Sequence, residues 1–376
     1  MRLLLLTNMA AYQQIELAQA FAEVLGANNV KLGVQRELSE GRRTMGWQEL
    51  HDASLMLRLN AEPAEKATLL RWIEDADVVI HGRFPIQYVR KRISAGKLTY
   101  AYQERVFKKG RTAWRIASRV PFLIKHYYSV NRSNYHLLAA GRYAAPDLVP
   151  LGLFRHRAWQ FGYFIESRPM PEKPAMSPLL VVWCGRLMLL KRPERALDFT
   201  KALMDSGIAV HTHIIGDGEL RGALEQRVQD NALSESVSFH GWQSVDAVNA
   251  LMQDAHIALM SSDHREGWGV VINEAINNGC FPIVCDEVGS ARWLIEHEST
   301  GLVYDDPRFD IMCAQFVRLF KRDPTLISQM SQRGHARFTS TWSAKAAAER
   351  LTTHANALLA HQSGHDLYES GPCSPA

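Results

Sequence analysis

The stretch HIALMSSDHREGWGVVINEAINNGCFPIVC, residues 256–285, contains a complete strand–loop–helix–strand pattern. Its two apolar runs, His256–Met260 and Phe281–Cys285, have the length of buried strands. Between them a polar loop with glycines leads into a helical segment, and Gly279 stands where a helix C-terminal cap belongs. Buried strands connected by a helix indicate a parallel sheet that is covered on both faces.

The same alternation continues along the chain. In the second half, apolar runs at Leu179–Cys184, Ile208–Ile215, Ser236–His240 and Gly301–Tyr304 alternate with helical patterns at Pro193–Met204, Glu219–Asn231, Val245–Asp254 and Ala291–Glu298. The first half begins similarly, with strands at Leu3–Thr7, Val30–Val34 and Val78–His81 and a helix whose apolar face carries Ile15, Ala18, Ala22 and Leu25 before Gly26. The pattern predicts two doubly wound, Rossmann-like α/β domains that face each other across a cleft.

Prolines mark the boundary between the two predicted domains. Pro169, Pro171, Pro174 and Pro178 indicate a linker at 169–178. We therefore expect an N-terminal domain at 1–168 and a C-terminal domain at 179–340. A C-terminal helix at 341–360 could return to the N-terminal domain, and residues 361–376 are expected to form a flexible tail.

The composition is that of a globular protein, with 47% hydrophobic and 22% charged residues in 376. The start, MRLLLLTN, is interpreted as a first strand rather than a signal peptide, and no apolar run is long enough to span a bilayer. Five cysteines are an odd number and lack the spacing of metal ligands. We expect reduced thiols, no metal site and a cytoplasmic location.

The positive charge is concentrated in one segment. Between Arg83 and Arg132 there are 13 Lys and Arg and one acid, Glu104, which gives a local charge of +12 in a chain of net charge +4. Nine aromatic residues are interleaved with these cations, a combination that suits lipid headgroups, a diphosphate or nucleic acid. A solvated basic face is the alternative, and nucleic acid is disfavoured because no recognised binding motif accompanies the charge.

Four loops after strands of the C-terminal domain carry charges, glycines or an aromatic residue. They contain Gly185, Arg186 and Lys191; Gly216, Asp217 and Gly218; Trp242; and Glu266, Gly267, Trp268, Gly269 and Val270. Ligands of open parallel sheets bind at the carboxyl ends of the strands, where these loops lie. A guanidinium and an ammonium at one strand end suit a diphosphate.

The spacing of Glu266 and Glu274 fits a ligand with two sugars. Gly267 and Gly269 permit close backbone approach before a helix, whose N-terminal N–H groups favour a phosphate. Glu274, about one turn inside that helix, could reach a ribose diol, and Glu266 could reach the hydroxyls of a second sugar. A capping glutamate and an exposed loop glutamate are the alternative.

The motif Glu266-GWGVVIN-Glu274 resembles the signature of retaining glycosyltransferases of family 4, which have a GT-B fold. CGR with Lys191, IIGDGEL, FHGW and the late GLVY follow the pattern of that family in order. The resemblance covers residues 179–305 strongly and the rest loosely. It implies transfer of a sugar from a nucleotide-diphosphate donor to an acceptor hydroxyl, with retention, without metal and without a cofactor other than the donor itself.

The resemblance also implies residue roles. Arg186 and Lys191 would stabilise the departing diphosphate, Glu266 would bind the transferred sugar, Glu274 the nucleotide ribose, and the loop of Trp242 would frame the base. His81, in VVIHGR, would face the donor sugar or be an ordinary buried histidine. The other glycine-loop residues, with Trp268 and Val270, complete the predicted donor site.

The acceptor side departs from the family pattern. The loop after the first strand, with Asn8, lacks the glycine pair of many relatives. RAWQFGYFIE, YQERVFKKG and LLAAGRYAAPD resemble stretches of bacterial enzymes that build surface polysaccharides. We therefore expect a glycan or polyprenyl-diphosphate-linked acceptor, with Arg83, Arg105, Lys108 and Lys109 on the acceptor or membrane side. Peripheral attachment to an anionic membrane is a further hypothesis; a non-catalytic sugar-nucleotide binder and a nucleotide-sugar epimerase remain alternatives.

Overall fold

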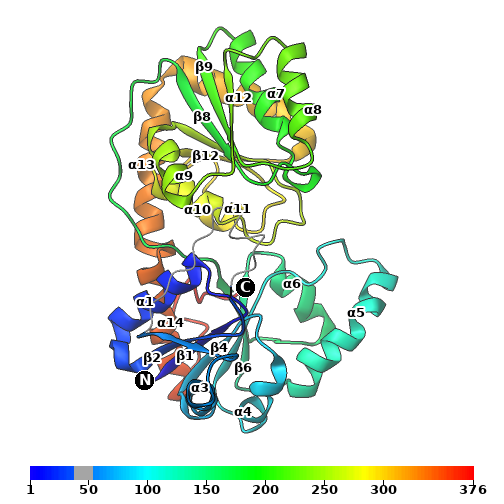
Figure 1. Ribbon diagram of the computed structural model, residues 1–376, viewed down its shortest axis with the longest axis vertical. Coiled ribbons are helices and arrows are strands. Elements are labelled where there is room, and N and C mark those ends of the chain that lie inside the picture. Colours follow the sequence, from blue (N-terminus) through cyan, green and yellow to red (C-terminus); the bar gives the residue numbers. More distant parts are fainter. Residues whose placement is uncertain (38–53) are drawn as a thin grey trace. The chain divides into compact units, whose positions relative to one another are not determined.

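The computed structural model describes residues 1–37 and 54–376, which form two compact α/β units (Figure 1). The N-terminal unit comprises residues 1–37, 54–166 and 341–376, and the C-terminal unit comprises residues 167–340. Each unit is built on one parallel sheet with helices on both faces. The predicted pair of doubly wound, Rossmann-like folds is confirmed.

The N-terminal unit has a seven-stranded parallel sheet of order β3-β2-β1-β4-β5-β6-β7. Its strands are β1 Leu3–Thr7, β2 Val30–Val34, β3 Met56–Arg58, β4 Val78–His81, β5 Thr99–Gln103, β6 Tyr135–Ala140 and β7 Ala158–Phe161. Its α-helices are α1 Tyr12–Leu25, α3 Pro63–Asp75, α4 Arg90–Ser94, α5 Ala113–His126, α6 Ala144–Leu148 and α14 Ala344–Leu359. Four leucines of β1 are fully buried, as expected for a strand covered on both faces.

The two faces of this sheet are covered by different helices. α14 packs against α1 on one face, where the Tyr100 hydroxyl of β5 lies 2.8 Å from Nδ1 of His354 in α14. On the other face, Leu69 of α3 packs against β1 and β2. Gly26 ends α1 with a φ of 86°, as its position after the apolar pattern predicted.

The C-terminal unit has a six-stranded parallel sheet of order β10-β9-β8-β11-β12-β13. Its strands are β8 Leu179–Cys184, β9 Val210–Ile215, β10 Val237–Gly241, β11 Ile257–Met260, β12 Phe281–Cys285 and β13 Leu302–Tyr304. Its α-helices are α7 Glu194–Asp205, α8 Arg221–Asp230, α9 Val245–Asp254, α10 Val271–Asn277, α11 Ala291–Leu294, α12 Phe309–Arg322 and α13 Thr325–Arg337. α7, α8 and α12 lie on one face of the sheet and α9, α10 and α13 on the other (Figure 1).

One predicted helix is shorter than its pattern. The helix expected at Ala291–Glu298 ends at Leu294 as α11, because Ile295 adopts an extended conformation and Glu298 has a φ of 61°. The Thr300 hydroxyl oxygen accepts a hydrogen bond from the Glu296 N–H, which closes a turn in place of a further helical turn. The longest described helix, α14, has 16 residues. No helix within residues 1–37 and 54–376 has the length and apolarity that crossing a bilayer requires.

The proline-rich segment 169–178 packs closely on the C-terminal unit. The Lys173 ammonium donates to the carbonyl oxygens of Met252, Ala255 and Asn278 at 2.9, 2.7 and 2.6 Å. These carbonyls belong to or directly follow the last turns of α9 and α10, where helices have unsatisfied acceptors. One cation therefore caps the C-termini of two helices.

The expected flexible tail at 361–376 is instead packed at its end against the N-terminal unit. The N–H groups of Cys373 and Ala376 donate to the carbonyls of Gln160 and Ala158 in β7, at 2.8 and 3.0 Å, and Gln160 donates to Ser374 at 2.7 Å. Cys373 and Ser374 are fully buried. The sequence expectation was wrong because β7 is an edge strand whose free backbone groups the tail satisfies in antiparallel fashion.

Two histidines are buried where α14 packs on the sheet. His354 lies against the ring of Trp159 at 4.4 Å between centroids, and the indole N–H of Trp159 donates to Nδ1 of His136 at 3.1 Å. Burial lowers the pKa of His354 to about 4 and that of His136 to about 3, with neighbouring positive groups contributing. Both rings are therefore neutral in the folded protein at neutral pH.

These histidines predict acid lability of the N-terminal unit. Their unfolded pKa is about 6.5, so below that pH the unfolded chain binds protons that the folded chain does not. The free energy of unfolding should fall as the pH drops from about 6.5 to about 4, by on the order of 3 kcal/mol per ring. Urea unfolding from pH 7.5 to 5 measures this slope. His354→Gln should flatten it, and His361→Asn, at an exposed position, should leave it unchanged; an unaltered slope in His354→Gln would contradict the assignment.

Candidate active site

The predicted donor residues gather at the carboxyl edge of the C-terminal sheet. β8 has β9 on one side and β11 on the other, so the chain reverses direction across the sheet between β8 and β11. At such a switch point the loops after the two strands diverge and leave a crevice for a ligand. Lys191 follows β8 and Glu266 follows β11, so the two predicted catalytic side chains come from either side of this point.

Lys191 and Glu266 form an ion pair. The Lys191 ammonium donates to Oε2 of Glu266, and both side chains are about four-fifths buried. Ser261, at the end of β11, holds the Lys191 loop in place, because its hydroxyl lies 2.8 Å from the carbonyl oxygens of both Lys191 and Arg192. The Asp263 N–H donates to the Leu190 carbonyl at 2.8 Å. The loops after β8 and β11 are thus joined by backbone contacts as well as by charge.

The glycines after β8 and β9 are required by close backbone approach. A Cβ on Gly216 would lie 2.0 Å from the Gly185 carbonyl oxygen, and one on Gly218 would lie 2.4 Å from that of Leu187. Gly216 also donates its N–H to the Gly241 carbonyl at 2.8 Å. The predicted glycine loops are therefore brought together, and their first physical role is to let three strand ends meet.

The loop before α10 differs from the expectation at one residue. Trp268, predicted to bind the donor, is fully buried and its indole N–H donates to Oδ1 of Asn273 at 2.8 Å. Its carbonyl accepts from the Ser290 hydroxyl at 2.6 Å. Trp268 is a core residue because the loop folds back onto the segment that follows β12, where a Cβ on Gly289 would lie 1.8 Å from the Gly267 carbonyl oxygen.

The short helix α10 places Glu274 close to the end of β8. α10 starts at Val271 and has seven residues, so its dipole is that of about two turns, and Gly269 precedes it with a φ of 89°. The carbonyl of Val270 accepts from the Glu274 N–H at 3.1 Å. Burial raises the pKa of the Cys184 thiol to about 12, and the neighbouring Glu274 carboxylate adds to this effect.

The remaining predicted donor residues lie nearer the surface. The Arg186 side chain is exposed, and Trp242 is 40% exposed. Asp217 accepts from Arg221 at 2.8 Å and from the Gly218 N–H at 2.7 Å, and these bonds lower its pKa. Asp217 thereby organises its own loop, while Arg186 and Trp242 offer a cation and an aromatic face to solvent.

His81, at the end of β4 in the N-terminal unit, is buried. Its Nε2 lies 2.8 Å from the Phe84 carbonyl, which can only accept, so Nε2 carries the proton and Nδ1 is free of it. Burial lowers the pKa of His81 to about 4, and the ring is neutral at neutral pH. His81 is suited to hydrogen bonding and not to carrying charge.

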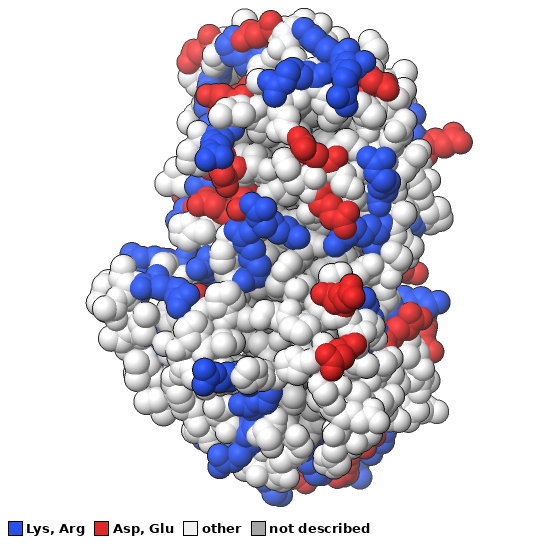
Figure 2. All heavy atoms as spheres, turned by 180° about the vertical axis from the view of Figure 1, so that it is seen from behind, with Lys and Arg blue, Asp and Glu red and all other residues white. Residues whose placement is uncertain are grey.

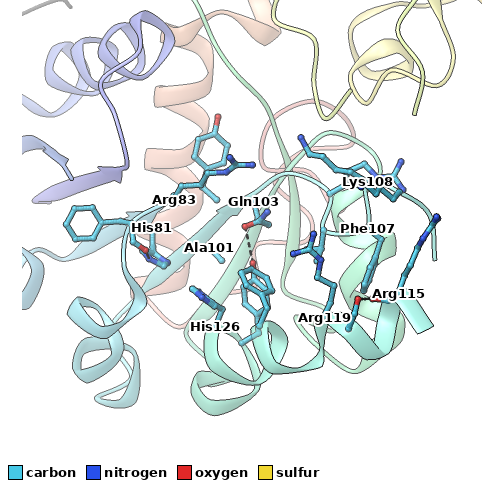
Figure 3. A pocket seen from close by; sticks show the side chains of 18 of the residues that line it. His81, Arg83, Ala101, Gln103, Phe107, Lys108, Arg115, Arg119 and His126 are labelled. Atoms are coloured by element: carbon cyan, nitrogen blue, oxygen red, sulfur yellow. Dashed lines mark hydrogen bonds between the residues drawn. The ribbon is translucent and has the colours of Figure 1, made fainter. Parts of the chain in front are cut away.

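The structure brings most of the predicted acceptor-side residues to one pocket of about 850 Å³ in the N-terminal unit (Figure 3). Arg83, Arg105, Lys108 and Lys109 line it together with His81. Asn8 lies instead in a smaller adjoining pocket, which it shares with Arg83. Arg105 is buried, pairs with Asp147 at 3.9 Å and stacks on Tyr143.

Several residues that shape these sites were not identified from the sequence. Ser261 and Asp263 tie two loops together, Gly289 permits the contact with Gly267, and Asp147 accepts from the N–H groups of Val106 and Phe107 at 2.9 Å. Ser261 and Asp263 directly follow a predicted strand, which was the available signal. No signal in the sequence pointed to Asp147, because its partners are 40 and 41 residues away along the chain.

With this geometry described, comparison with known proteins shows what the C-terminal unit is similar to. Residues 166–337 match the family described as Glycosyl transferases group 1. The matched segment coincides with the C-terminal unit and makes up somewhat less than half of the chain. The match lies on the segment whose motifs carried the resemblance, and it includes the loops of Lys191, Glu266 and Glu274.

Curated relatives of the group 1 domain are bacterial glycosyltransferases. A GDP-mannose-dependent alpha-(1-6)-phosphatidylinositol dimannoside mannosyltransferase of Mycobacterium tuberculosis is 30% identical over 176 residues, covering 46% of this chain and 43% of the relative. The lipopolysaccharide core biosynthesis glycosyltransferase LpsD of Rhizobium meliloti is 26% identical over 197 residues, covering 49% and 52%. This chain thus spans about half the length of the curated relatives it matches.

The similarity in structure extends beyond the group 1 domain. The crystal structure of Anabaena Alr3699/HepE in complex with UDP has a TM-score of 0.67 and 13% identity, and the match covers 95% of this chain and all of the other. At that identity the likeness shows the fold alone. The predicted GT-B fold is confirmed.

The glycine contacts predict a sharp difference between two alanine substitutions. Gly216→Ala should lower the free energy of unfolding by about 2–4 kcal/mol, because the new Cβ meets a carbonyl oxygen and the φ of 122° is strained for any other residue. Gly222→Ala, in α8 with open space around its Cβ, should be neutral or slightly stabilising. Thermal and urea unfolding of both variants measures this, and equal stabilities would contradict the packing described.

Proposed function

We propose that this protein is a retaining, metal-independent glycosyltransferase. It transfers a sugar from a nucleotide-diphosphate sugar to a hydroxyl of a glycan or lipid-linked glycan acceptor in bacterial polysaccharide biosynthesis, such as that of capsule, O-antigen or exopolysaccharide. The family of the C-terminal unit supports sugar transfer. The single observation that carries the proposal is the Lys191–Glu266 ion pair at the switch point of the C-terminal sheet.

The ion pair sets the charge that a donor would meet. Lys191 has three N–H donors, so it can hold Glu266 and a phosphate oxygen at the same time. An arriving diphosphate competes with Glu266 for the ammonium, and this frees carboxylate lone pairs for the hydroxyls of the donor sugar. Arg186, exposed after β8, supplies the second cation, and Glu274 and Trp242 complete the proposed contacts to ribose and base.

The proposed reaction replaces one bond at the anomeric carbon by another on the same face. The bond to the diphosphate oxygen breaks, the bond to the acceptor oxygen forms, and the acceptor proton passes to the departing phosphate oxygen. Negative charge therefore grows on the diphosphate as the bond breaks. Lys191 and Arg186 stabilise this charge most strongly in the transition state, which is the condition for raising the rate. His81 remains a predicted contact of the donor sugar.

Glu266 and Lys191 provide the direct test of this function. Glu266→Gln keeps the shape but removes the charge, and Lys191→Met removes the cation; each should lower release of nucleoside diphosphate from a nucleotide sugar by about 10²–10³-fold. Glu235→Gln, at an exposed position before β10, is the matched control and should retain full turnover. Screening nucleotide sugars by thermal shift first identifies the donor to use.

The products separate this function from its alternatives. Free nucleoside diphosphate together with a glycosylated acceptor of retained configuration supports transfer. An intact donor with an inverted hydroxyl would identify an epimerase, and tight donor binding without any turnover in the unaltered protein would identify an accessory binder.

We also propose that the protein attaches to the inner face of the plasma membrane through α5. The polar side of α5, with Arg115, Ser118 and Arg119, lines the pocket of about 850 Å³ in the N-terminal unit. Its apolar side is exposed: Val120 and Ile124 are 41% and 52% exposed. In Figure 2, α5 lies at the left edge of the lower unit, where an uncharged surface borders Lys and Arg side chains. Outward apolar residues beside cations suit an anionic bilayer.

Membrane attachment is tested by vesicle flotation. The unaltered protein should float with vesicles containing anionic lipid and less with neutral ones. Val120→Glu combined with Ile124→Glu should abolish flotation, because two charges would enter the interface, and Ile311→Glu, at an exposed position of α12, should not. Absence of the unaltered protein from both kinds of vesicle, at any salt concentration, would rule out this attachment.

A further inference from the structure

The pocket of about 850 Å³ lies within the N-terminal unit, at the carboxyl ends of β4 and β5. One wall is the polar side of α5, another is the loop 104–110, and the floor is the end of the sheet with His81, Ala101 and Gln103. Figure 3 shows Arg119 extending from α5 toward Gln103, with Lys108 and Phe107 on the loop beside it. Its volume is in the upper part of the range for small-molecule sites.

The charges around this pocket are strongly one-sided. Six Lys and Arg line it, and no Asp or Glu does so among the described residues. Glu104, just outside, pairs with Lys108 at 2.7 Å and with Arg83 at 3.8 Å, and Asp147 pairs with Arg105. In the described part of the chain, no carboxylate lies within 4 Å of the other three cations, Lys109, Arg115 and Arg119. Like charges gathered in a concave site attract an anion.

The loop that carries these cations is held firmly. Buried Asp147 of α6 accepts from the N–H groups of Val106 and Phe107 at 2.9 Å, while it pairs with Arg105. Glu104 accepts from Lys108 and from the Tyr163 hydroxyl at 2.6 Å. Two carboxylates therefore fix the backbone of the loop. The free energy of folding offsets the repulsion between the gathered cations. The site is therefore formed before a ligand binds.

Aromatic side chains form the rest of the lining. Phe107, Phe122 and Tyr127 lie on the inner wall, and Trp114 stands at the N-terminal end of α5 with 71% of its surface exposed. The Tyr127 hydroxyl donates to Oε1 of Gln103 at 3.1 Å, and the Gln103 amide nitrogen donates to the Glu104 carbonyl at 2.9 Å, which fixes this amide at the pocket floor. Aromatic faces beside amide and hydroxyl groups suit the apolar faces and hydroxyls of a sugar.

His126 reflects the same accumulation of positive charge. It lines the pocket from the last turn of α5. Burial lowers its pKa, and the charges of Lys125 and Arg90 lower it further. His126 is thus a neutral hydrogen-bonding group, and the positive field of the pocket comes from its lysines and arginines.

We propose that this pocket binds a phosphate- or diphosphate-bearing saccharide, with Arg115, Arg119 and Lys109 on the phosphate and the aromatic wall on the sugar. This inference rests on the proposed function, because such a molecule would be the acceptor. It narrows that function, because the phosphate of the acceptor would lie next to the sugar residue whose hydroxyl receives the transferred sugar. A guanidinium pair grips phosphate oxygens in a fork, and Lys109 supplies a third, mobile charge.

The pocket favours this ligand over two alternatives. A neutral glycan would leave three cations uncompensated at the bottom and rim of a concave site. A lipid surface cannot reach the floor formed by His81, Ala101 and Gln103, because the polar side of α5 faces inward while its apolar side faces outward. The two sides of α5 therefore have separate partners.

Binding to the full chain tests the inference without turnover. The measurements use Lys191→Gln as background, so that the proposed diphosphate contact of the C-terminal unit is removed. Calorimetric titration with pyrophosphate, a hexose 1-phosphate, a short-chain prenyl diphosphate and a neutral methyl hexoside should show saturable binding of the three anions and at least tenfold weaker binding of the hexoside. Arg115→Gln and Arg119→Gln should each weaken anion binding about tenfold, and Arg71→Gln, on α3, should not change it.

Each outcome decides the inference. Tighter binding of the prenyl diphosphate points to a lipid-linked source and tighter binding of the hexose phosphate to a phosphorylated glycan, and both support the pocket. Three results would overturn it: anion binding by Arg119→Gln that equals binding by the protein with Arg119, binding of the neutral hexoside as tight as that of the anions, or displacement of the bound anions by anionic vesicles only. If the Lys191→Gln protein binds these anions but the unaltered protein turns over no nucleotide sugar, the proposed function fails and the pocket inference stands. If the unaltered protein turns over a nucleotide sugar but the Lys191→Gln protein binds none of these anions, the pocket inference fails and the proposed function stands.

Discussion

The Lys191–Glu266 ion pair is the interaction on which the C-terminal unit's chemistry depends. It joins the loops after β8 and β11 at the point where the sheet's connections diverge. Ser261 fixes the carbonyls around Lys191, and the Asp263 N–H binds the same loop, so the ammonium is placed by the backbone before any ligand arrives. A charge that is positioned in this way stabilises a transition state without a rearrangement of the surrounding protein groups during the reaction.

The two units handle positive charge in different ways. In the C-terminal unit, Lys191 is balanced by Glu266 and Arg192 by Glu287 at 2.6 Å, so these two cations are neutralised within the fold. In the N-terminal pocket, two carboxylates pair with three of the six cations and act mainly as anchors for a loop. When an anionic ligand binds beside Lys191, it replaces Glu266 as the partner of a cation that was already neutralised. In the N-terminal pocket, the ligand supplies the negative charge that the unpaired cations lack among the described residues. The first arrangement suits a step in which charge develops, and the second suits recognition.

Sequence reasoning identified the C-terminal unit well because its signals are local. Apolar strands of four to six residues, glycines at strand ends and the spacing of Glu266 and Glu274 all lie within short windows. Trp268 was misassigned because a loop aromatic next to glycines has the same pattern whether it points outward or into the core. In the N-terminal unit β5, β6 and β7 went unrecognised, since runs such as TYAYQ mix polar and aromatic residues. Asp147 and the pairing of Cys373 with Gln160 depend on contacts far apart in sequence, which no local pattern records.

The anchoring of the segment between the units has a mechanical consequence. On the N-terminal side, Ile165 accepts from Ala344 at 2.9 Å and Glu166 donates to Glu16 at 3.1 Å. On the other side, Arg168 donates to Asn277 at 2.9 Å, and further along Lys173 is fixed by two helix ends. The proline-rich segment 169–178 is therefore held by the C-terminal unit. One residue, Ser167, separates the hydrogen bond of Glu166 from that of Arg168. The two backbone torsions of Ser167 are thus the point at which this connection passes from the hydrogen bonds of one unit to those of the other.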